Sequence, residues 1–366
     1  MKLKDKTLSA NTGLDAIKRA PIVEYDTGLK CIRIQDISQG KNYDEWGFTE
    51  TNEKDRKKFL LKKNDLLIAR TGATVGVSQF IKEDTEAVYN NGTIRLRLEK
   101  SLNPRFVYYI FQTKGFLQYI DNISCVATQP NLRIEGLLRF TIPDYSIEKQ
   151  NAIVKTLSTF DDLIENNNKR IKLLKQMAEN LYKEWFVRFR FPGYEDVEFE
   201  EKKPRSWQVG TEDKKHFAPT IFRYDEFGTI GSFVRGKNIT AAQMIEENIP
   251  VISAGLQPSG YHNEANVFGE NLTISASGAN AGYLQYNLND IWAADCSYYQ
   301  DNATIWFVYN TLKYLQPVIS NLQCGAAQPH VYPKNINSLC ILIPTEELIH
   351  KYNDFVKPYY DEIKVL

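Results

Sequence analysis

The chain has 366 residues, and its 45 basic and 45 acidic residues give a formal net charge of zero. This balance argues against a protein that coats nucleic acid by bulk electrostatics, although a local basic face is compatible with it. A hydrophobic content of 43% and a charged content of 25% are typical of a folded soluble protein, and the length is sufficient for two domains with separate cores.

The five cysteines are scattered, and no two of them form a C-x-x-C pair. A disulfide framework and a thiolate metal site are therefore not expected. The four histidines are isolated, so no zinc-ligand spacing is present. The N-terminus lacks the apolar core of a signal peptide, and no apolar run is long enough to cross a bilayer. The sequence predicts a soluble protein of a reducing cytoplasm.

The first module is predicted to span residues 1–144, and three landmarks identify it. Residues 67–76 (LIARTGATVG) contain a tight glycine turn, residues 128–131 (TQPN) contain a rigid proline, and residues 140–143 (FTIP) end a strand just before a long helix. Basic residues cluster on either side of the first landmark, and they are explained equally well as a solvated face or as a binding face: Lys57, Lys58, Lys62, Lys63, Arg95 and Arg97.

A long helix is predicted from Ser146, a suitable N-cap, to about Phe186, within a central segment of residues 145–190. Its apolar residues recur alternately four and three positions apart, which is typical of a coiled-coil seam. Only Asn167 is polar in this seam, and it either fixes the register or lies at a wet point. The predicted seam consists of Ile153, Leu157, Phe160, Ile164, Asn167, Ile171, Leu174, Ala178, Leu181 and Trp185.

The second module is predicted at residues 206–344, after a charged, proline-bearing linker at 191–205. It repeats the landmarks of the first in the same order: residues 272–282 (LTISASGANAG), 327–330 (AQPH) and 341–344 (ILIP), again followed by a helix. Such an ordered repeat, at a separation of about 200 residues, indicates duplication. Residues 231–238 (GSFVRGKN) differ from a phosphate-binding P-loop by Asn238 in place of a hydroxyl residue, so a strand and glycine turn that present Arg235 and Lys237 are favoured.

A second, shorter helix is predicted at residues 345–366, where Ile349, Tyr352, Val356 and Tyr359 continue the seam spacing. Pro358 predicts a kink or a break in it. If the two helices pair antiparallel, the shorter one leaves part of the first seam uncovered. We expect the uncovered stripe to bind another protein or a second copy of the chain.

No catalytic constellation was found, and the remaining polar chemistry suits the reading of hydrogen-bond patterns. The glycine turns and the Gln-Pro turns present short polar side chains that could contact phosphates or base edges, although turn formation alone explains them about as well. The candidate DNA-contacting residues are Arg33, Gln35, Arg70, Thr71, Thr74, Arg95, Gln129, Asn131, Arg235, Lys237, Ser277, Asn280, Gln328 and His330.

The chain resembles the specificity subunit of type I restriction-modification enzymes over nearly its full length. The resemblance is carried by residues 67–76, by the two Gln-Pro turns followed by Ile-Pro, and by the central runs 146–154 (SIEKQNAIV), 161–167 (DDLIENN) and 182–186 (YKEWF). It implies an α+β fold with two similar target-recognition domains, separated by long antiparallel coiled-coil helices of which the second is shortened here.

The resemblance also implies a function. Each domain would read one half of a bipartite site in double-stranded DNA, and the helices would set the spacer and recruit modification subunits and, through them, restriction subunits. The chain would not itself be an enzyme, and S-adenosylmethionine, ATP and Mg would be bound by the partner subunits.

Two alternatives are compatible with the same sequence. One is a DNA-binding specificity module outside type I systems. The other is a coiled-coil adaptor whose duplicated domains bind protein, for which Tyr261, Tyr283 and Tyr286 provide apolar surface in the second module.

Overall fold

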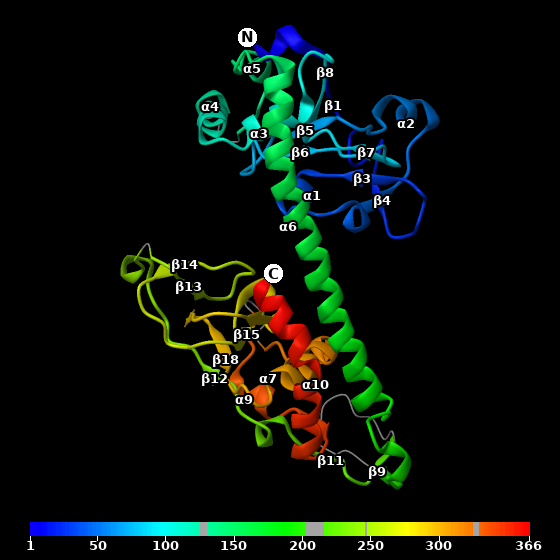
Figure 1. Cartoon of the computed structure of the whole chain (residues 1–366), viewed down its shortest axis with the longest axis vertical. Coiled ribbons are helices and arrows are strands. Elements are labelled where there is room, and N and C mark those ends of the chain that lie inside the picture. The colour runs from blue at the N-terminus through cyan, green and yellow to red at the C-terminus, as the bar shows by residue number, and fades with distance from the viewer. Residues whose placement is uncertain (125–129, 203–215, 246, 325–328) are drawn as a thin grey trace. The chain divides into compact units, whose positions relative to one another are not determined.

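One helix, α6 (Ile147–Tyr182), belongs to both of the units into which the chain divides. The computed structural model describes residues 1–124, 130–202, 216–245, 247–324 and 329–366 (Figure 1). Unit 1 is Met1–Ile164 and unit 2 is Glu165–Leu366. Within the described residues, no helix is both long enough and apolar enough to span a membrane.

Unit 1 contains two four-stranded sheets, with strand orders β1-β8-β5-β6 and β2-β4-β3-β7. The first is antiparallel, and the second contains one parallel pair, β3 with β7. Helices α3 to α5 follow the last strand. The bounds are β1 (Thr7–Thr12), β2 (Ile22–Val23), β3 (Lys30–Ile32), α1 (Ile34–Ser38), β4 (Gly47–Thr49), α2 (Glu53–Phe59), β5 (Leu66–Ala69), β6 (Ser78–Phe80), β7 (Ala87–Tyr89), β8 (Thr93–Leu98), α3 (Pro104–Phe111), α4 (Lys114–Ser124) and α5 (Ile134–Leu138).

Unit 2 repeats this topology. Its sheet β12-β18-β15-β16 has the same order as β1-β8-β5-β6, and its sheet β14-β13-β17 again contains one parallel pair. The predicted duplication is therefore confirmed. The bounds are β9 (Phe199–Lys202), β10 (His216–Pro219), β11 (Arg223–Glu226), β12 (Val234–Arg235), β13 (Ile249–Ile252), β14 (Gly260–His262), β15 (Asn271–Ser275), β16 (Leu284–Asn287), β17 (Trp292–Ala293), β18 (Cys296–Tyr299), α7 (Ile305–Tyr314), α8 (Gln316–Ser320), α9 (Pro333–Asn337), β19 (Cys340–Ile343) and α10 (Glu346–Val365).

A glycine at the same place in both units lets the chain pass close to a neighbouring backbone. Gly13 follows β1, and a Cβ there would lie 2.1 Å from the carbonyl oxygen of Tyr89. Gly236 follows β12, and a Cβ there would lie 2.5 Å from the carbonyl oxygen of Ala294. Neither site can accept a side chain without a shift of the backbone. Glycine is therefore required where the chain after β1 passes the end of β7, and where the chain after β12 passes the end of β17.

Helix α6 begins where the sequence predicts. Ser146 accepts a hydrogen bond from the Lys149 amide at 3.4 Å, as an N-cap does. The helix continues to Tyr182 and ends in a π-helical turn, Lys183–Val187. Beyond it, in the predicted linker, Phe191 is buried in the core of unit 2 and β9 pairs with β10.

Helix α10 packs antiparallel to the second half of α6, as predicted. The Tyr352 hydroxyl donates to the carbonyl of Ala178 at 2.9 Å, and further along Arg170 pairs with Glu362. At the end of α10, the Asn167 amide lies 3.5 Å from the carbonyl of Leu366. Asn167 therefore lies at the end of the paired region, half-buried.

The predicted break at Pro358 is wrong, because α10 is continuous through it. Pro358 itself is exposed, whereas Tyr352, Val356, Tyr360 and Ile363 on the opposite face are buried. Burial of these side chains on both sides of the proline holds the helix together despite the missing N–H donor.

Aromatic side chains form the core that joins α6, α7 and α10. Tyr360 stacks on Trp306 with ring centroids 5.1 Å apart and planes 7° apart. Phe186 packs edge-on against Phe307 and Tyr352 at 4.9 Å and 5.2 Å. Burial raises the pKa of the Tyr360 hydroxyl, which accepts from the Asn310 amide. The helices are thus part of the core of unit 2.

The predicted seam divides into a covered and an uncovered part. The covered part lies in the core of unit 2 and comprises Ile171, Leu174, Ala178, Leu181, Trp185, Ile349, Tyr352, Val356 and Tyr359. Ile153 instead packs on the core of unit 1. Leu157, Phe160 and Ile164 are 38%, 59% and 60% exposed, so this stretch of the helix presents apolar side chains to solvent.

Replacing Tyr360 by alanine should destabilise unit 2 by about 3–5 kcal/mol, because it removes the ring stacked on Trp306 and leaves a cavity. The measurement is chemical denaturation followed by tryptophan fluorescence. Tyr261→Ala, at a side chain that is 48% exposed, is the matched control and should change stability by less than about 0.5 kcal/mol. Equal effects of the two substitutions would contradict the aromatic core described here.

Replacing Pro358 by alanine should stabilise unit 2 by about 1–3 kcal/mol, because alanine restores the missing N–H donor at an exposed helix position. The thermal midpoint should rise accordingly. Lys351→Ala, also exposed on α10, serves as the control. A lower midpoint for the Pro358→Ala protein would mean that α10 depends on the proline.

Candidate nucleic-acid interface

A main-chain clamp holds the glycine turn against the proline-bearing segment in each unit. In unit 1 the Leu132 amide donates to the Arg70 carbonyl at 2.7 Å and the Gly72 amide to the Pro130 carbonyl at 3.4 Å. In unit 2 the corresponding bonds, Val331 to Ala276 and Gly278 to Pro329, measure 3.0 Å and 3.1 Å. Each clamp contains one isolated β-bridge, Thr71 with Asn131 and Ser277 with His330.

The turns themselves have the same geometry. Gly72 and Gly76 have φ of +83° and +93°, and Gly278 and Gly282 have φ of +73° and +86°. Each turn closes with a bond between its last glycine and the preceding strand, Gly76 to Ala69 at 3.0 Å and Gly282 to Ser275 at 2.8 Å. Since side chains strongly disfavour such φ values, the glycines explain why both turns retain this backbone.

The clamp of unit 1 presents a guanidinium and an amide next to each other. The Arg70 Nη2 donates to Asn131 Oδ1 at 3.1 Å, and Asn131 is exposed. Thr71 and Thr74 are half-buried on the same turn. The start of α1, which carries Arg33 and Gln35, lies beside this clamp: Gly92, whose carbonyl accepts from the Arg70 amide at 2.9 Å, is in close contact with Ile34.

Arg33 and Gln35 differ in availability. Arg33 is half-buried, and its Nε donates to Asp36 at 3.3 Å. Gln35 is exposed. Gln35 thus presents its side-chain amide to solvent next to the turn, whereas Arg33 is paired with Asp36.

Arg95 is not at the surface, and its assignment as a DNA contact is corrected. Its side chain is 3% exposed because it lies over the Tyr89 ring, 5.1 Å from the centroid, and its guanidinium donates to the carbonyls of Lys58 and Leu60 at 3.4 Å. Burial lowers its pKa. Arg95 therefore stabilises the interior of unit 1.

The clamp of unit 2 differs because an aspartate occupies it. Asp295 accepts hydrogen bonds from the Ser277 hydroxyl and from Arg235. Ser277 is 8% exposed, so its hydroxyl is neither at the surface nor free, and its predicted role as a contact is corrected. Arg235 is partly exposed but already paired with a carboxylate.

The remaining candidates of unit 2 lie around this aspartate. Lys237 is exposed and lies over the Trp292 ring at 5.8 Å, and the Asn280 amide donates to Ala254 at 3.4 Å. The His330 ring stacks on Tyr332 with a centroid distance of 5.8 Å. Gln129 and Gln328 lie outside the described residues.

Asp295 belongs to no sequence motif and is therefore absent from the predicted contacts. The main-chain hydrogen bonds show which position of unit 1 corresponds to it. The Ala276 amide donates to the Asp295 carbonyl at 3.2 Å, and the Arg70 amide donates to the Gly92 carbonyl at 2.9 Å, so Asp295 and Gly92 occupy equivalent positions. Aligning the two modules on their strands would have placed a carboxylate in one clamp and none in the other.

The P-loop-like segment of unit 2 uses its amides within the sheet. The Gly236 amide donates to Cys296 at 2.8 Å and the Lys237 amide to Ala293 at 2.9 Å. These N–H groups are therefore unavailable to a phosphate. The described ranges also contain no group of three His, Cys, Asp or Glu side chains placed to hold a metal ion.

The two units carry opposite net charge. Residues 1–164 contain 25 Lys and Arg against 21 Asp and Glu, whereas residues 165–366 contain 20 against 24. The neutrality of the whole chain thus conceals a basic first unit, which is the better suited of the two to attract a polyanion.

Residues 23–176 and 221–365 each match the family described as the type I restriction modification DNA specificity domain. The chain is 26% identical over 342 residues to the type I restriction enzyme MjaIX specificity subunit of Methanocaldococcus jannaschii, which covers 89% of this chain and 77% of the relative. It is 29% identical over 149 residues to the HindI specificity subunit of Haemophilus influenzae, covering 38% and 32% of the two chains.

Among solved structures, the fold is similar to that of a type I restriction-modification S subunit from M. genitalium. The TM-score is 0.55 at 19% identity, and the likeness covers 99% of this chain and 89% of the other. At this identity the comparison supports the fold alone.

Replacing Gly72 by alanine should cost about 1–2 kcal/mol of stability, because alanine must adopt the left-handed backbone there although space is available. Gly115→Ala is the matched control: the site in α4 is equally open and has no positive φ, so the substitution should be neutral or slightly stabilising. Both are measured by thermal unfolding. A neutral Gly72→Ala substitution would show that the turn does not need its present backbone.

Proposed function

The chain belongs to the type I restriction-modification DNA specificity family, and we propose that its two units read different halves of one bipartite DNA site. It is a specificity subunit with two target-recognition domains. The observation that carries the proposal is the pair of clamps, which share their main-chain bonds but carry different side chains. A shared frame with different polar groups is what two unlike half-sites require.

The clamp of unit 1 has the chemistry for base contact. In the major groove an arginine pairs best with guanine and an asparagine with adenine, each through two hydrogen bonds. Arg70 and Asn131 lie within 3.1 Å of each other, so DNA would meet them as one surface. The lysines and arginines around them would supply phosphate contacts, which position the protein without reading sequence.

The clamp of unit 2 would read DNA differently. Both carboxylate oxygens of Asp295 already accept hydrogen bonds, so Asp295 would act by orienting a neighbouring cation and not by contacting a base. Its bonds to Ser277 and Arg235 hold it in place, and the main chain of His330 forms a β-bridge with Ser277. We propose that Asn280, His330 and Lys237 contact DNA here and that Asp295 orients Arg235.

The uncovered stripe on α6 is proposed as the docking surface for a modification subunit. Leu157, Phe160 and Ile164 continue the spacing that pairs the rest of α6 with α10, so a partner helix could extend the same seam. A second copy of this chain is the other candidate partner. The continuous α6 is proposed to set the length of the spacer between the half-sites.

The chemistry of modification and cleavage is assigned to partner subunits. We propose that S-adenosylmethionine, ATP and Mg bind there, that restriction subunits join through the modification subunits, and that this chain is non-catalytic. A cytoplasmic location is part of the same proposal, because the complex must reach chromosomal DNA.

The adaptor alternative has less support in unit 2 than the sequence indicated. Tyr261 and Tyr283 are 48% and 45% exposed, but the Tyr286 hydroxyl donates to Glu270 and its ring packs against Tyr360. Tyr286 therefore belongs to the core beneath α10.

The double variant Arg70→Ala, Asn131→Ala should relax base preference in one half of the selected DNA motif only. Loss of a bidentate contact of about 1–3 kcal/mol predicts a fall in discrimination of about 5- to 150-fold at the bases concerned. The measurement is selection from a random duplex library by the complex with modification subunits. His330→Ala is the mirror control and should affect the other half.

The results of this selection distinguish the bipartite reader from the adaptor. Relaxation confined to opposite halves supports the proposal. Unchanged selection by both variants would exclude the clamps as readers, and no selection by the wild-type complex would favour the adaptor.

The double variant Phe160→Glu, Ile164→Glu should abolish binding of the modification subunit while unit 1 keeps its fold, because both side chains are exposed. Size-exclusion chromatography with light scattering measures the complex, and circular dichroism checks the fold. Lys155→Glu, Lys172→Glu is the matched control on the same helix. A complex that survives the apolar substitutions would exclude this stripe as the docking surface.

A further inference from the structure

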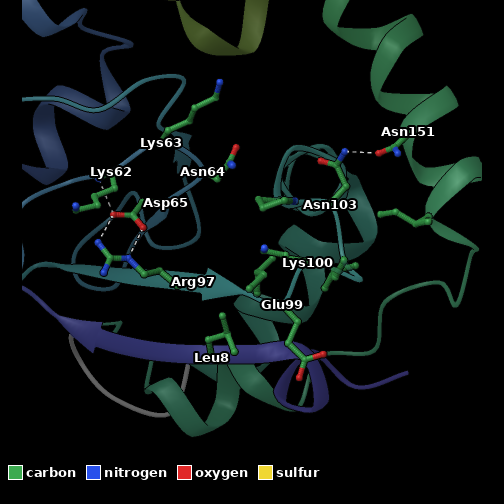
Figure 2. A pocket seen from close by; sticks show the side chains of 14 residues that line it. Leu8, Lys62, Lys63, Asn64, Asp65, Arg97, Glu99, Lys100, Asn103 and Asn151 are labelled. Carbon is green, nitrogen blue, oxygen red and sulfur yellow. Dashed lines mark hydrogen bonds and ion pairs between the residues drawn. The ribbon is translucent and has the colours of Figure 1, made fainter.

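We propose that an open cavity on unit 1 binds the phosphate backbone of nucleic acid outside the bases read by the clamp; this inference rests on the proposed function. The cavity has a volume of about 610 Å³ and is lined from the loop before β5, the end of β8 and the first turns of α3 and α6 (Figure 2).

The floor of the cavity carries more positive than negative charge. Asp65 is 1% exposed and binds Arg97 through two hydrogen bonds, of 2.6 Å and 3.0 Å. The buried Arg95 lies behind them, with its Nε 4.0 Å from the same carboxylate. One carboxylate thus faces two guanidinium groups, so these three side chains together carry one net positive charge.

The rim adds three lysines without a carboxylate partner. Lys62, Lys63 and Lys100 are exposed, and none of them has an ion pair among the described residues. Two carboxylates lie near these lysines, and both have a partner: Glu99 pairs with Lys6 at 3.2 Å, and Asp84 accepts from the Lys63 amide at 2.8 Å. An anion that enters the cavity would therefore meet the ammonium groups of three lysines, and Figure 2 shows Lys62, Lys63 and Lys100 around the Asp65–Arg97 pair.

The basic surface extends beyond the cavity, which favours a chain of phosphates over a single small anion. Arg97 donates to the Leu60 carbonyl at 3.3 Å and Arg95 to the Lys58 carbonyl at 3.4 Å, so the end of α2 adjoins the floor. Lys57 and Lys58 are exposed there. Together these residues form a strip, and nucleic-acid binding without sequence preference uses basic surfaces that follow the backbone.

The cavity is separate from the clamp. Asp65 precedes β5 and Arg70 follows it, so the two sites lie at opposite ends of a four-residue strand, about 13 Å long. β8 runs antiparallel to β5, so its end, next to Lys100, also lies at the cavity side. Phosphates held here would thus not belong to the base pairs at the clamp, and the site would add affinity without changing base preference.

The test uses the full chain in complex with its modification subunits and a duplex that lacks the selected motif. The variant Lys62→Gln, Lys63→Gln, Lys100→Gln should weaken binding at least tenfold at low salt, and it should reduce the slope of log K against log salt by up to about 2.7. Lys18→Gln, Lys114→Gln, Lys155→Gln removes three exposed charges elsewhere in unit 1 and is the control. Acetylation of lysines followed by mass spectrometry should show protection of Lys62, Lys63 and Lys100 by the duplex.

The results distinguish a phosphate-binding cavity from a cavity that binds an acidic protein segment or has no role in binding. Weakened binding with an unchanged selected motif, specific to the cavity variant, supports the proposal. Equal effects of both variants, or no protection of the three lysines, overturn it and leave the proposed function intact. Loss of the modification subunit from the cavity variant, with DNA binding otherwise unchanged, would assign the cavity to an acidic protein segment. Failure of the wild-type complex to bind any duplex would contradict the proposed function and this inference together.

Discussion

The burial of aromatic side chains between α6, α7 and α10 is the interaction on which the rest of unit 2 depends. A helix of 20 residues with an internal proline is marginal alone, so α10 persists because Tyr352 and Tyr360 are inserted into the core. The same core fixes the second half of α6 through Tyr182, Trp185 and Phe186. The target-recognition fold and the helices are therefore one packed body, and a change in the core reaches both.

The duplication could be predicted from the sequence because backbone geometry restricts residue choice. Gly72, Gly76, Gly278 and Gly282 all require positive φ, so these glycines survive while the side chains around them diverge. The start of α6 and the seam spacing were predictable for a similar reason, because capping and periodicity are local. The fold class therefore followed from local signals repeated in order.

The side-chain contacts could not be predicted, because they depend on partners that are distant in sequence. Arg95 and Arg97 look equivalent on β8, but Arg95 is inside because the Tyr89 ring and the end of α2 cover it. The sequence predicts a surface hydroxyl at Ser277, but Ser277 donates to Asp295, which precedes β18 and is distant in sequence. Pro358 breaks helices locally, yet burial on the opposite face outweighs it here. The uncovered stretch at Phe160, by contrast, followed from the unequal lengths of the two helices.

The two units combine a shared backbone with different electrostatics, which is what a reader of two unlike half-sites needs. Unit 1 is basic, and its clamp presents Arg70 and Asn131, while unit 2 is acidic, and its clamp is built around Asp295. The most direct test is to map adenine methylation by the wild-type complex with modification subunits, using single-molecule sequencing of the modified DNA. Two different short motifs separated by a fixed gap are expected, whereas a symmetric motif would mean that only one of the units reads DNA.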